Sequence, residues 1–184
     1  MDVVFETLSL RVQPVRLDDL AGVCAYAADP QVMRYFLLDL GSEEKIAAFL
    51  ADGVAARQQS PALRRLHLFS AFARTDGAFV GSGLIEIDAD SRASAEIGYM
   101  FCREAWGRGY ASELAWALVA HGLRDLGLHR VWGKCDARNL ASARVLEKCG
   151  MQREGLLREH VWLDGQWRSS LVFGILRQEW EAGQ

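Results

Sequence analysis

The chain has 184 residues, of which 51% are hydrophobic and 24% are charged, a balance typical of a globular protein. This length suits a single domain with a complete core over residues 1–184. The formal net charge of −3 disfavours nucleic-acid binding, which usually needs a basic surface. No apolar run approaches the ~20 residues of a membrane span, and the acidic start Met1–Glu6 is unlike a signal peptide. We therefore expect a cytoplasmic protein without nucleic-acid or membrane partners.

The first third of the chain predicts one strand followed by helices. Apolar and polar residues alternate around Leu8 and Val12, as in a half-buried strand. Asp18 and Ser42 are suitable N-caps for two helices, because their side chains can accept a hydrogen bond from the first helical turn. The elements predicted here are helices over 18–28 and 43–59, ended by Pro30 and Pro61, with a short helix or lid-like loop between them over 31–38.

The remaining sequence predicts strands that alternate with two further helices. Thr75–Gly77 is a hairpin turn signal. Apolar residues at helical spacing predict a helix over 114–126, and Asn139 can cap another helix that Gly150 ends. The resulting order, β-α-α-β-β-β-α-β-α-β-β, is typical of an α/β (α+β) fold with a mixed, largely antiparallel sheet. The predicted strands are 67–74, 79–88, 95–101, 130–135, 152–163 and 166–176, the last two joined at Asp164-Gly165.

A glycine-bearing loop, Trp106-Gly107-Arg108-Gly109-Tyr110-Ala111, lies between an expected strand and an expected helix. Glycine permits positive φ, and a helix start presents N–H groups and partial positive charge, so this loop favours a phosphate ligand. A dinucleotide loop would need a third glycine where Ser112 stands and a first glycine closer to the strand. On this loop alone, a coenzyme A phosphate site and a turn without a ligand both stay open.

The surrounding sequence resembles the GNAT family of acetyl-CoA-dependent N-acetyltransferases, most closely the RimJ/RimL type, which acetylates protein N-terminal amines. The resemblance is strong over about 60 residues, from Glu96 to Gly155, and thinner over the first 60. It implies a central sheet of about seven strands with helices on both faces, acetyl-CoA as cosubstrate and no metal. The matching residues are Glu96-Ile97-Gly98-Tyr99, the Gly-Arg-Gly-Tyr-Ala loop, Asn139 with Ser142, Leu146-Glu147-Lys148-Cys149-Gly150-Met151, Tyr35 with Phe36, and Gly174-Ile175-Leu176 with Glu179-Trp180.

The resemblance implies how coenzyme A is held. The loop N–H groups bind its phosphates, and the strand before the loop has a bulge and splays from the next parallel strand, so that the pantetheine arm lies between them. Trp106 replaces the Gln or Arg common in the family, which favours a backbone role for this residue; Arg103 and Arg144 are further candidate cations. The expected coenzyme A residues are Met100, Phe101, Cys102, Trp106, Gly107, Arg108, Gly109, Tyr110, Ala111, Asn139 and Ser142.

Two residues are the candidates for chemistry. Glu96 lies early on the strand that leads to the loop, where several family members place a base that acts through water; apolar neighbours would raise its pKa toward neutrality. Glu159 and His160 are rival bases. Many family members protonate the leaving thiolate with a tyrosine, but Leu146 stands at the matching position, so we expect the Ser142 hydroxyl to serve the leaving sulfur instead.

Few residues in the sequence indicate which amine accepts the acetyl group. Aromatic residues of the expected acceptor walls, Tyr35, Phe36 and Trp162, are the candidates for contact with the amine, with Met33 and Trp167 beside them. The resemblance favours a protein N-terminal α-amine, whose pKa of ~7.7–8.0 eases deprotonation. A small-molecule amine acceptor and a non-catalytic acyl-CoA-binding module stay as alternatives. Similar proteins are often dimers, so a homodimer is also open.

The four cysteines predict structural thiols rather than chemistry. They are spread along the chain without a Cys-x-x-Cys pair. A zinc site lacks paired ligand spacing, and a nucleophilic cysteine does not fit a family that transfers the acetyl group directly to the amine. The residues that such a zinc site would use as ligands are His129, Cys135, Cys149 and His160.

Overall fold

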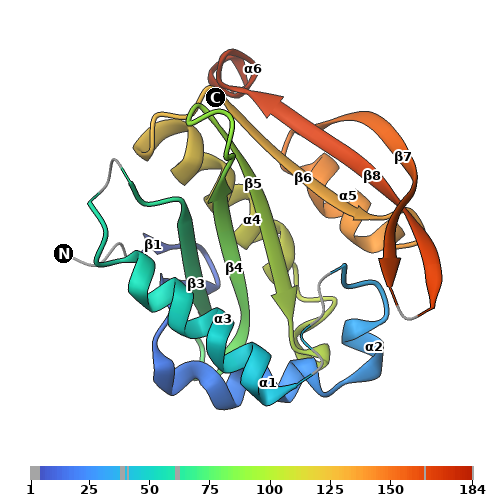
Figure 1. Ribbon diagram of the computed structural model, residues 1–184. Coiled ribbons are helices and arrows are strands. Elements are labelled where there is room, and N and C mark those ends of the chain that lie inside the picture. The colour runs from blue at the N-terminus through green and yellow to red at the C-terminus, as the bar shows by residue number, and fades with distance from the viewer. Residues whose placement is uncertain (1–4, 38–39, 41, 61–62, 164, 184) are drawn as a thin grey trace.

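The computed structural model describes residues 5–37, 40, 42–60, 63–163 and 165–183; the expected positions Leu38, Pro61 and Asp164 lie outside these ranges. Within them, eight strands form one sheet in the order β1-β2-β3-β4-β5-β6-β8-β7 (Figure 1). Among the strands of the described ranges, only β5 and β6 pair in parallel. The strands are β1 Phe5–Glu6, β2 Leu10–Pro14, β3 Leu66–Ala73, β4 Phe79–Ile87, β5 Ser94–Phe101, β6 Arg130–Asp136, β7 Gln152–Leu163 and β8 Gln166–Leu176.

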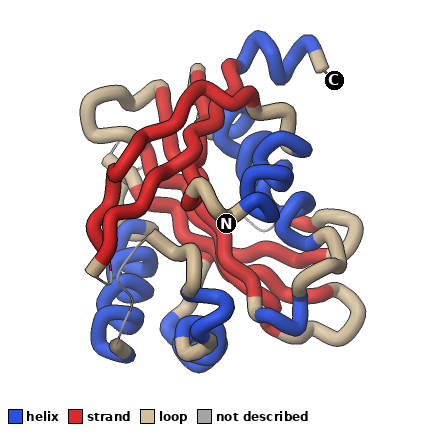
Figure 2. Tube along the Cα trace, turned by 90° about the vertical axis from the view of Figure 1, so that its right-hand side faces the viewer, coloured by secondary structure: helices blue, strands red, loops and turns tan. Residues whose placement is uncertain are grey.

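Helices cover both faces of the sheet (Figure 2). The helices α4 and α5 pack on one face, and α1 and α3 pack on the other. None of the described helices is long and apolar enough to cross a membrane. The helices are α1 Leu20–Ala27, α2 Pro30–Met33, α3 Glu43–Ala56, α4 Tyr110–Ala120, α5 Leu140–Lys148 and α6 Arg177–Ala182.

Strand β5 contributes side chains to both cores, because successive residues of a strand point to opposite faces. Ile97 and Phe101 are buried in the core under α4 and α5. Met100 is buried in the second core, under α1 and α3. The parity of a residue number in β5 therefore tells on which face of the sheet its side chain lies.

The predicted fold class is confirmed: the sheet is mixed, largely antiparallel and covered on both faces. Strands β7 and β8 have the predicted bounds. Ser42 and Asn139 cap α3 and α5 as predicted, since their side chains accept from the N–H groups of Lys45 and Ser142. The eighth strand is the short β1, which pairs with β2.

Several expected details in the first third were wrong. Leu8 is 88% exposed and precedes β2, which begins at Leu10. The expected cap Asp18 is not the N-cap of α1: that position is Asp19, whose carboxylate makes no capping bond to the helix and accepts instead from the Arg16 N–H and from the buried Ser70 hydroxyl of β3. Pro30 does not simply end a helix: it begins α2, where the first helical position needs no N–H donor.

Two further differences lie toward the C-terminus. The helix expected over 114–126 begins earlier, at Tyr110; it is α-helical to Ala120 and continues as a π-helix over His121–Asp125. Gly127, with φ of 70°, follows its end as predicted. The sheet is also followed by the helix α6, which the predicted order lacks.

The fold predicts an acid-sensitive site at His67, on β3. Burial, with the nearby Arg64 and His121, lowers the pKa of His67 to about 4 from its usual 6.5. Because the folded state binds this proton less readily than the unfolded state, the stability that depends on neutral His67 is present above pH 6.5 and is lost as the pH falls toward 4. We expect the melting temperature to fall between pH 7 and pH 5, and to fall less in His67→Gln. The exposed His129→Gln is the matched control; an equal slope in wild type and His67→Gln would contradict the assignment.

Candidate active site

The glycine loop has the shape of an anion site. Gly107 and Gly109 have φ of 75° and 83°, and a Cβ at either position would meet nothing within 4 Å. α4 starts directly after Gly109, whose carbonyl accepts from the N–H groups of Ser112 and Glu113. The N–H groups of the first helical residues have no intrahelical acceptor, so this helix start offers free donors and the positive end of its dipole to an anion.

The side chains around the loop fix its position. The Trp106 indole N–H donates to the Phe101 carbonyl at 3.1 Å, so this side chain packs back on β5 and only the backbone of Trp106 belongs to the loop. Tyr110 is buried, with its ring 6.5 Å from that of Phe101. Arg103, an expected phosphate cation, is paired with Asp29 at 2.9 Å. Arg108 and Arg144 are exposed.

Strands β5 and β6 separate in front of this loop. Their parallel pairing covers only Ser94–Glu96 with Arg130–Trp132, and beyond it the strands diverge; we call this divergence the fork (Figure 1). The splay expected at this place is present, but the expected bulge is not, because the register of β5 with β4 is unbroken. The separation arises from β6, which stays paired with β8 along its length.

The hydrogen-bond pattern of β5 shows which N–H groups face the fork. The Cys102 N–H donates to the Val80 carbonyl at 2.9 Å. In an antiparallel pair every second residue bonds to the partner strand, so the N–H groups of Met100 and Cys102 point to β4. Those of Tyr99 and Phe101 point instead toward the fork. Of the three expected positions, Phe101 is thus the one whose N–H can polarise a carbonyl placed there.

The first turn of α5 reaches the fork from the other side. The Asn139 side chain accepts from the Ser142 N–H at 3.1 Å, which places Ser142 at the start of the helix. The Ser142 hydroxyl lies 3.0 Å from the Tyr99 hydroxyl of β5. Leu146, at the position of the family tyrosine, is 2% exposed and belongs to the core. The structure therefore brings a tyrosine to Ser142 from β5 rather than from α5.

Glu96 lies at the apex of the fork. Its carboxylate accepts from the Lys134 ammonium of β6 at 2.8 Å, and that ammonium also lies 5.2 Å from the Trp132 ring. Burial raises the pKa of Glu96, although the hydrogen bond and charge of Lys134 oppose this rise. The raised pKa of Glu96 expected from the sequence is thus present, but the sequence pattern did not predict that Lys134 moderates it. A carboxyl group of this kind can accept a proton near neutral pH.

A cavity of about 430 Å³ opens beside Glu96, toward the N-terminal end of β5. Its carboxylates come from the end of β4, the following loop and β5. Arg65 is the cation among its lining residues. The cavity is therefore predominantly acidic; its carboxylate residues are Glu86, Asp88, Asp90 and Glu96.

The rival bases lie in a bulge of β7, where residues 158–160 lie opposite the single residue Ser169 of β8. Pairing with β8 shifts between Leu157 and Val161, and within this bulge Glu159 has φ of 47°. The Glu159 N–H donates to the Ser169 hydroxyl at 3.1 Å, and His160 Nδ1 lies 3.2 Å from the Ser170 hydroxyl. Both residues are exposed.

Tyr35 lies between two guanidinium groups, those of Arg34 at 5.0 Å and Arg138 at 5.8 Å from its ring centre. The Arg34 carbonyl accepts from buried Arg168 of β8 at 2.7 Å, so the segment after α2 is fastened to the sheet beside β6. Phe36 is half-buried against the core of α1 and α3. Tyr35 and Phe36 thus lie on the face of the sheet that Glu96 shares.

Trp162 is placed differently from the expectation. It pairs with Trp167 across the β7–β8 hairpin, with their rings 5.2 Å apart and their side chains 57% and 56% exposed. Arg168 points toward the segment after α2, and neighbouring residues of a strand point to opposite faces. Trp167, and Trp162 with it, therefore point away from Tyr35.

The cysteine thiols next to the fork are not activated as nucleophiles. Burial raises the pKa of Cys135 to about 11 and that of Cys149 to about 12, so both are thiols at neutral pH. In the described ranges, no three His, Cys, Asp or Glu side chains are grouped so as to hold a metal ion.

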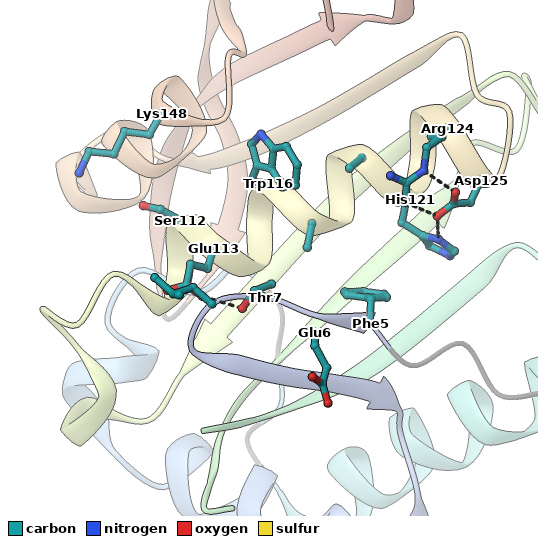
Figure 3. A pocket seen from close by; sticks show the side chains of 13 residues that line it. Phe5, Glu6, Thr7, Ser112, Glu113, Trp116, His121, Arg124, Asp125 and Lys148 are labelled. Carbon is teal, nitrogen blue, oxygen red and sulfur yellow. Dashed lines mark hydrogen bonds and ion pairs between the residues drawn. The ribbon is translucent and has the colours of Figure 1, made fainter. Parts of the chain in front are cut away.

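A second cavity, of about 560 Å³, lies between β1 and the outer side of α4 (Figure 3). Glu113, in the first turn of α4, accepts from the Thr7 hydroxyl at 2.6 Å and from the Ser9 N–H at 2.9 Å. These bonds fasten the start of α4, and thus the glycine loop, to the N-terminal strands. No local sequence pattern predicts this clamp, because its partners are more than 100 residues apart.

Comparison with solved structures and curated proteins agrees with this geometry. A GNAT-family acetyltransferase from Bacillus anthracis superimposes with a TM-score of 0.83 at 26% identity, covering 96% of this chain and 99% of that one. The N-acetyltransferase p20 of Bacillus licheniformis is 30% identical over 181 residues, which cover 95% of this chain and 96% of p20.

Some similar proteins have named ligands or acceptors. The ribosomal protein uS5-alanine N-acetyltransferase of Escherichia coli is 25% identical over 88 residues, 48% of this chain and 45% of that one. Two further structures share the fold: RimL, the ribosomal L7/L12 α-N-protein acetyltransferase, solved with coenzyme A, and a spermidine N-acetyltransferase from Vibrio cholerae, solved with coenzyme A and spermine. Their TM-scores are 0.81 and 0.80, their identities 17% and 18%, and they cover 95% and 94% of this chain and 98% of their own.

The domain model described as acetyltransferase (GNAT) domain matches residues 9–152, a range that contains the glycine loop, the fork and the first turn of α5. The sequence matches, the fold and the geometry of the site thus agree with one another, and the protein belongs to the GNAT family of N-acetyltransferases.

Proposed function

We propose that this protein forms one domain that transfers the acetyl group of acetyl-CoA to a protein N-terminal α-amine, by direct attack of the amine on the thioester. The observation that supports this best is the fork: a divergence of two strands, with the open glycine loop and helix start at its end. The loop backbone, from Gly107 to Ala111, would bind the phosphates, and the pantetheine arm would extend into the fork. The Phe101 N–H would polarise the thioester carbonyl.

The reaction needs a base and a group that stabilises sulfur. The amine nitrogen forms a bond with the carbonyl carbon, and its proton passes through water to Glu96. The carbon–sulfur bond then breaks, and its electron pair stays on the sulfur beside the Ser142 hydroxyl. Tyr35 and Phe36 are the acceptor contacts that we retain, because they lie on the same face of the sheet as Glu96.

One sequence similarity and one chemical argument support an α-amine acceptor. The similarity to the uS5-alanine N-acetyltransferase covers nearly half of this chain. An α-amine also has a pKa of ~7.7–8.0, so a carboxylate can deprotonate it more easily than it can a lysine amine.

A small polyamine is the second candidate acceptor. The acidic cavity beside Glu96 favours a cationic acceptor, and four carboxylate residues line it. Turnover of acetyl-CoA with short peptides that begin with Ala or Ser, against spermidine and spermine, separates the two classes. Peptide turnover supports the first proposal, and polyamine turnover alone replaces it. Coenzyme A binding without turnover of any amine would indicate a non-catalytic binding module.

The loop assignment is tested by Gly109→Val. A β-branched residue at positive φ is strained, and its side chain would occupy the space offered to the phosphate. We expect acetyl-CoA affinity, measured by calorimetry, to fall more than about tenfold, or ~1.4 kcal/mol. Gly77→Val is the matched control, because Gly77 has φ of 71° and equally open surroundings in a remote turn. Equal affinity in the two variants would refute the phosphate site, and NAD serves as the negative control ligand.

The base assignment is tested by Glu96→Gln. We expect kcat to fall by about 100-fold or more, the usual contribution of a general base, with acetyl-CoA affinity unchanged. The exposed Glu86→Gln, which removes a carboxylate from the paired position of β4, should keep most of the activity. If Glu159→Gln loses the activity and Glu96→Gln keeps it, the base lies on the β7 bulge instead.

The pH dependence of kcat tests the role of Glu96 through its ion-pair partner Lys134. Deprotonated Glu96 is the active form, so kcat should rise with pH as the carboxyl group ionises. Lys134 opposes the burial that raises the pKa of Glu96, so Lys134→Met should raise this pKa further. We therefore expect the acid limb of the profile to move to higher pH in Lys134→Met. An unmoved acid limb would show that a different group sets it.

A further inference from the structure

The fork contains a pair of hydroxyl groups, and the proposed reaction gives a role to only one of them, that of Ser142. The Tyr99 hydroxyl of β5 lies 3.0 Å from the Ser142 Oγ and 3.2 Å from the Ser142 carbonyl oxygen. Tyr99 and Ser142 come from the two sides of the fork, 43 residues apart in the chain. Their contact spans the fork on the face that α4 and α5 cover. A sulfur placed beside Ser142 on this face would therefore lie near this pair.

The protonation state of Tyr99 determines whether it can donate a hydrogen bond within this pair. Burial raises the pKa of Tyr99 above its ordinary value of 10, so the phenol keeps its proton at working pH. The phenol hydrogen has two acceptors within reach, the Ser142 Oγ at 3.0 Å and the Ser142 carbonyl oxygen at 3.2 Å, and the shorter of the two contacts is to the Oγ. Each hydroxyl has one hydrogen, so the hydrogen of Ser142 then points to another acceptor, either the neighbouring Cys135 sulfur or a sulfur placed in the fork. Without the phenol, the serine hydroxyl would be free to turn toward a backbone carbonyl of its own helix.

We propose that Tyr99 is a positioning residue: it donates to the Ser142 Oγ and thereby directs the Ser142 hydroxyl hydrogen to the sulfur of coenzyme A, which it stabilises as a thiolate. This inference rests on the proposed function. As the amine–carbon bond forms, the carbon–sulfur bond breaks and its electron pair stays on the sulfur. The proton of the amine goes to Glu96, and the thiolate takes a proton from solvent after release. Tyr99 and Ser142 keep their own protons throughout.

The first test compares two acetyl donors, acetyl-CoA and acetyl-seleno-CoA, in wild type and in Tyr99→Phe. A selenolate is a weaker base than a thiolate and needs less stabilisation as it leaves. With a short Ala-initial peptide, we expect Tyr99→Phe to lower kcat about tenfold for the thioester, the effect of one lost hydrogen bond. For the selenoester the loss should be less than about twofold. The ratio of the two rates does not depend on the fraction of folded enzyme. Equal losses with both donors would overturn the inference.

A double-mutant cycle tests whether Tyr99 acts through Ser142. If it does, Tyr99→Phe should change the thioester rate little once Ser142→Ala is present. Additive effects of the two substitutions would contradict it. Tyr26→Phe is the matched control, because the buried Tyr26 hydroxyl makes an equivalent bond to the Ser82 hydroxyl at 2.7 Å, between α1 and β4. It should lower thermal stability without changing the ratio between donors.

A binding measurement separates this inference from the acceptor question. The pKa of the coenzyme A thiol in the complex can be followed by thiolate absorbance, with no amine present. We expect Tyr99→Phe to raise this pKa by about one unit relative to wild type, which corresponds to the same tenfold effect. An unchanged thiol pKa would overturn the role of Tyr99 even in an active enzyme. A raised pKa in a protein that acetylates no tested amine would uphold it while the proposed function failed.

Discussion

The separation of β5 from β6 is the constraint on which the rest of the site depends. Each of these parallel strands is bonded to its outer neighbour: β5 to β4 as far as the Cys102 N–H, and β6 to β8 as far as the Ala137 N–H, which donates to Ser169. Because strands twist relative to one another, two strands held in this way move apart along their length once their own pairing stops. No bulge is needed in β5 to open the sheet. The divergence alone leaves the N–H groups of Tyr99 and Phe101 without a partner strand.

Parallel pairing also explains why the phosphate loop and Ser142 share one end of the fork. The carboxyl ends of parallel strands lie at the same edge of a sheet, and there each strand leads into a helix: β5 into α4, and β6 into α5. The turn after β6 is fixed by Asp136, which is 1% exposed and accepts from the Arg138 backbone and guanidinium groups. Burial opposes the ionised form, but the bonds to Arg138 outweigh it and lower the pKa of Asp136. A charged carboxylate beneath this turn thus holds the start of α5 against the fork.

Local signals made much of this structure predictable, and distant contacts account for most of what was missed. The caps Ser42 and Asn139 and the glycine loop depend on neighbouring residues, so the sequence alone reveals them. Asp18 is a good cap locally, but Asp19 takes the N-cap position of α1, and its carboxylate accepts from the Ser70 hydroxyl, 51 residues away, instead of from the first turn of the helix. Tyr99 belongs to a recognised motif, yet its contact with Ser142 exists only in the folded chain. The face on which Trp162 lies depends on the β7 bulge, which no residue pattern announced.

The proposed reaction places its two charged steps on opposite faces of the sheet. Glu96 and Tyr99 are three positions apart in β5, so their side chains point to different sides. Glu96 and Lys134 occupy the face of α1 and α3, where an amine would lose its proton. Tyr99 and Ser142 occupy the face of α4 and α5, where the sulfur would gain negative charge. A carboxylate beside the developing thiolate would repel it and raise the energy of bond cleavage. An odd spacing along one strand is therefore enough to keep the base and the leaving group on opposite faces of the sheet.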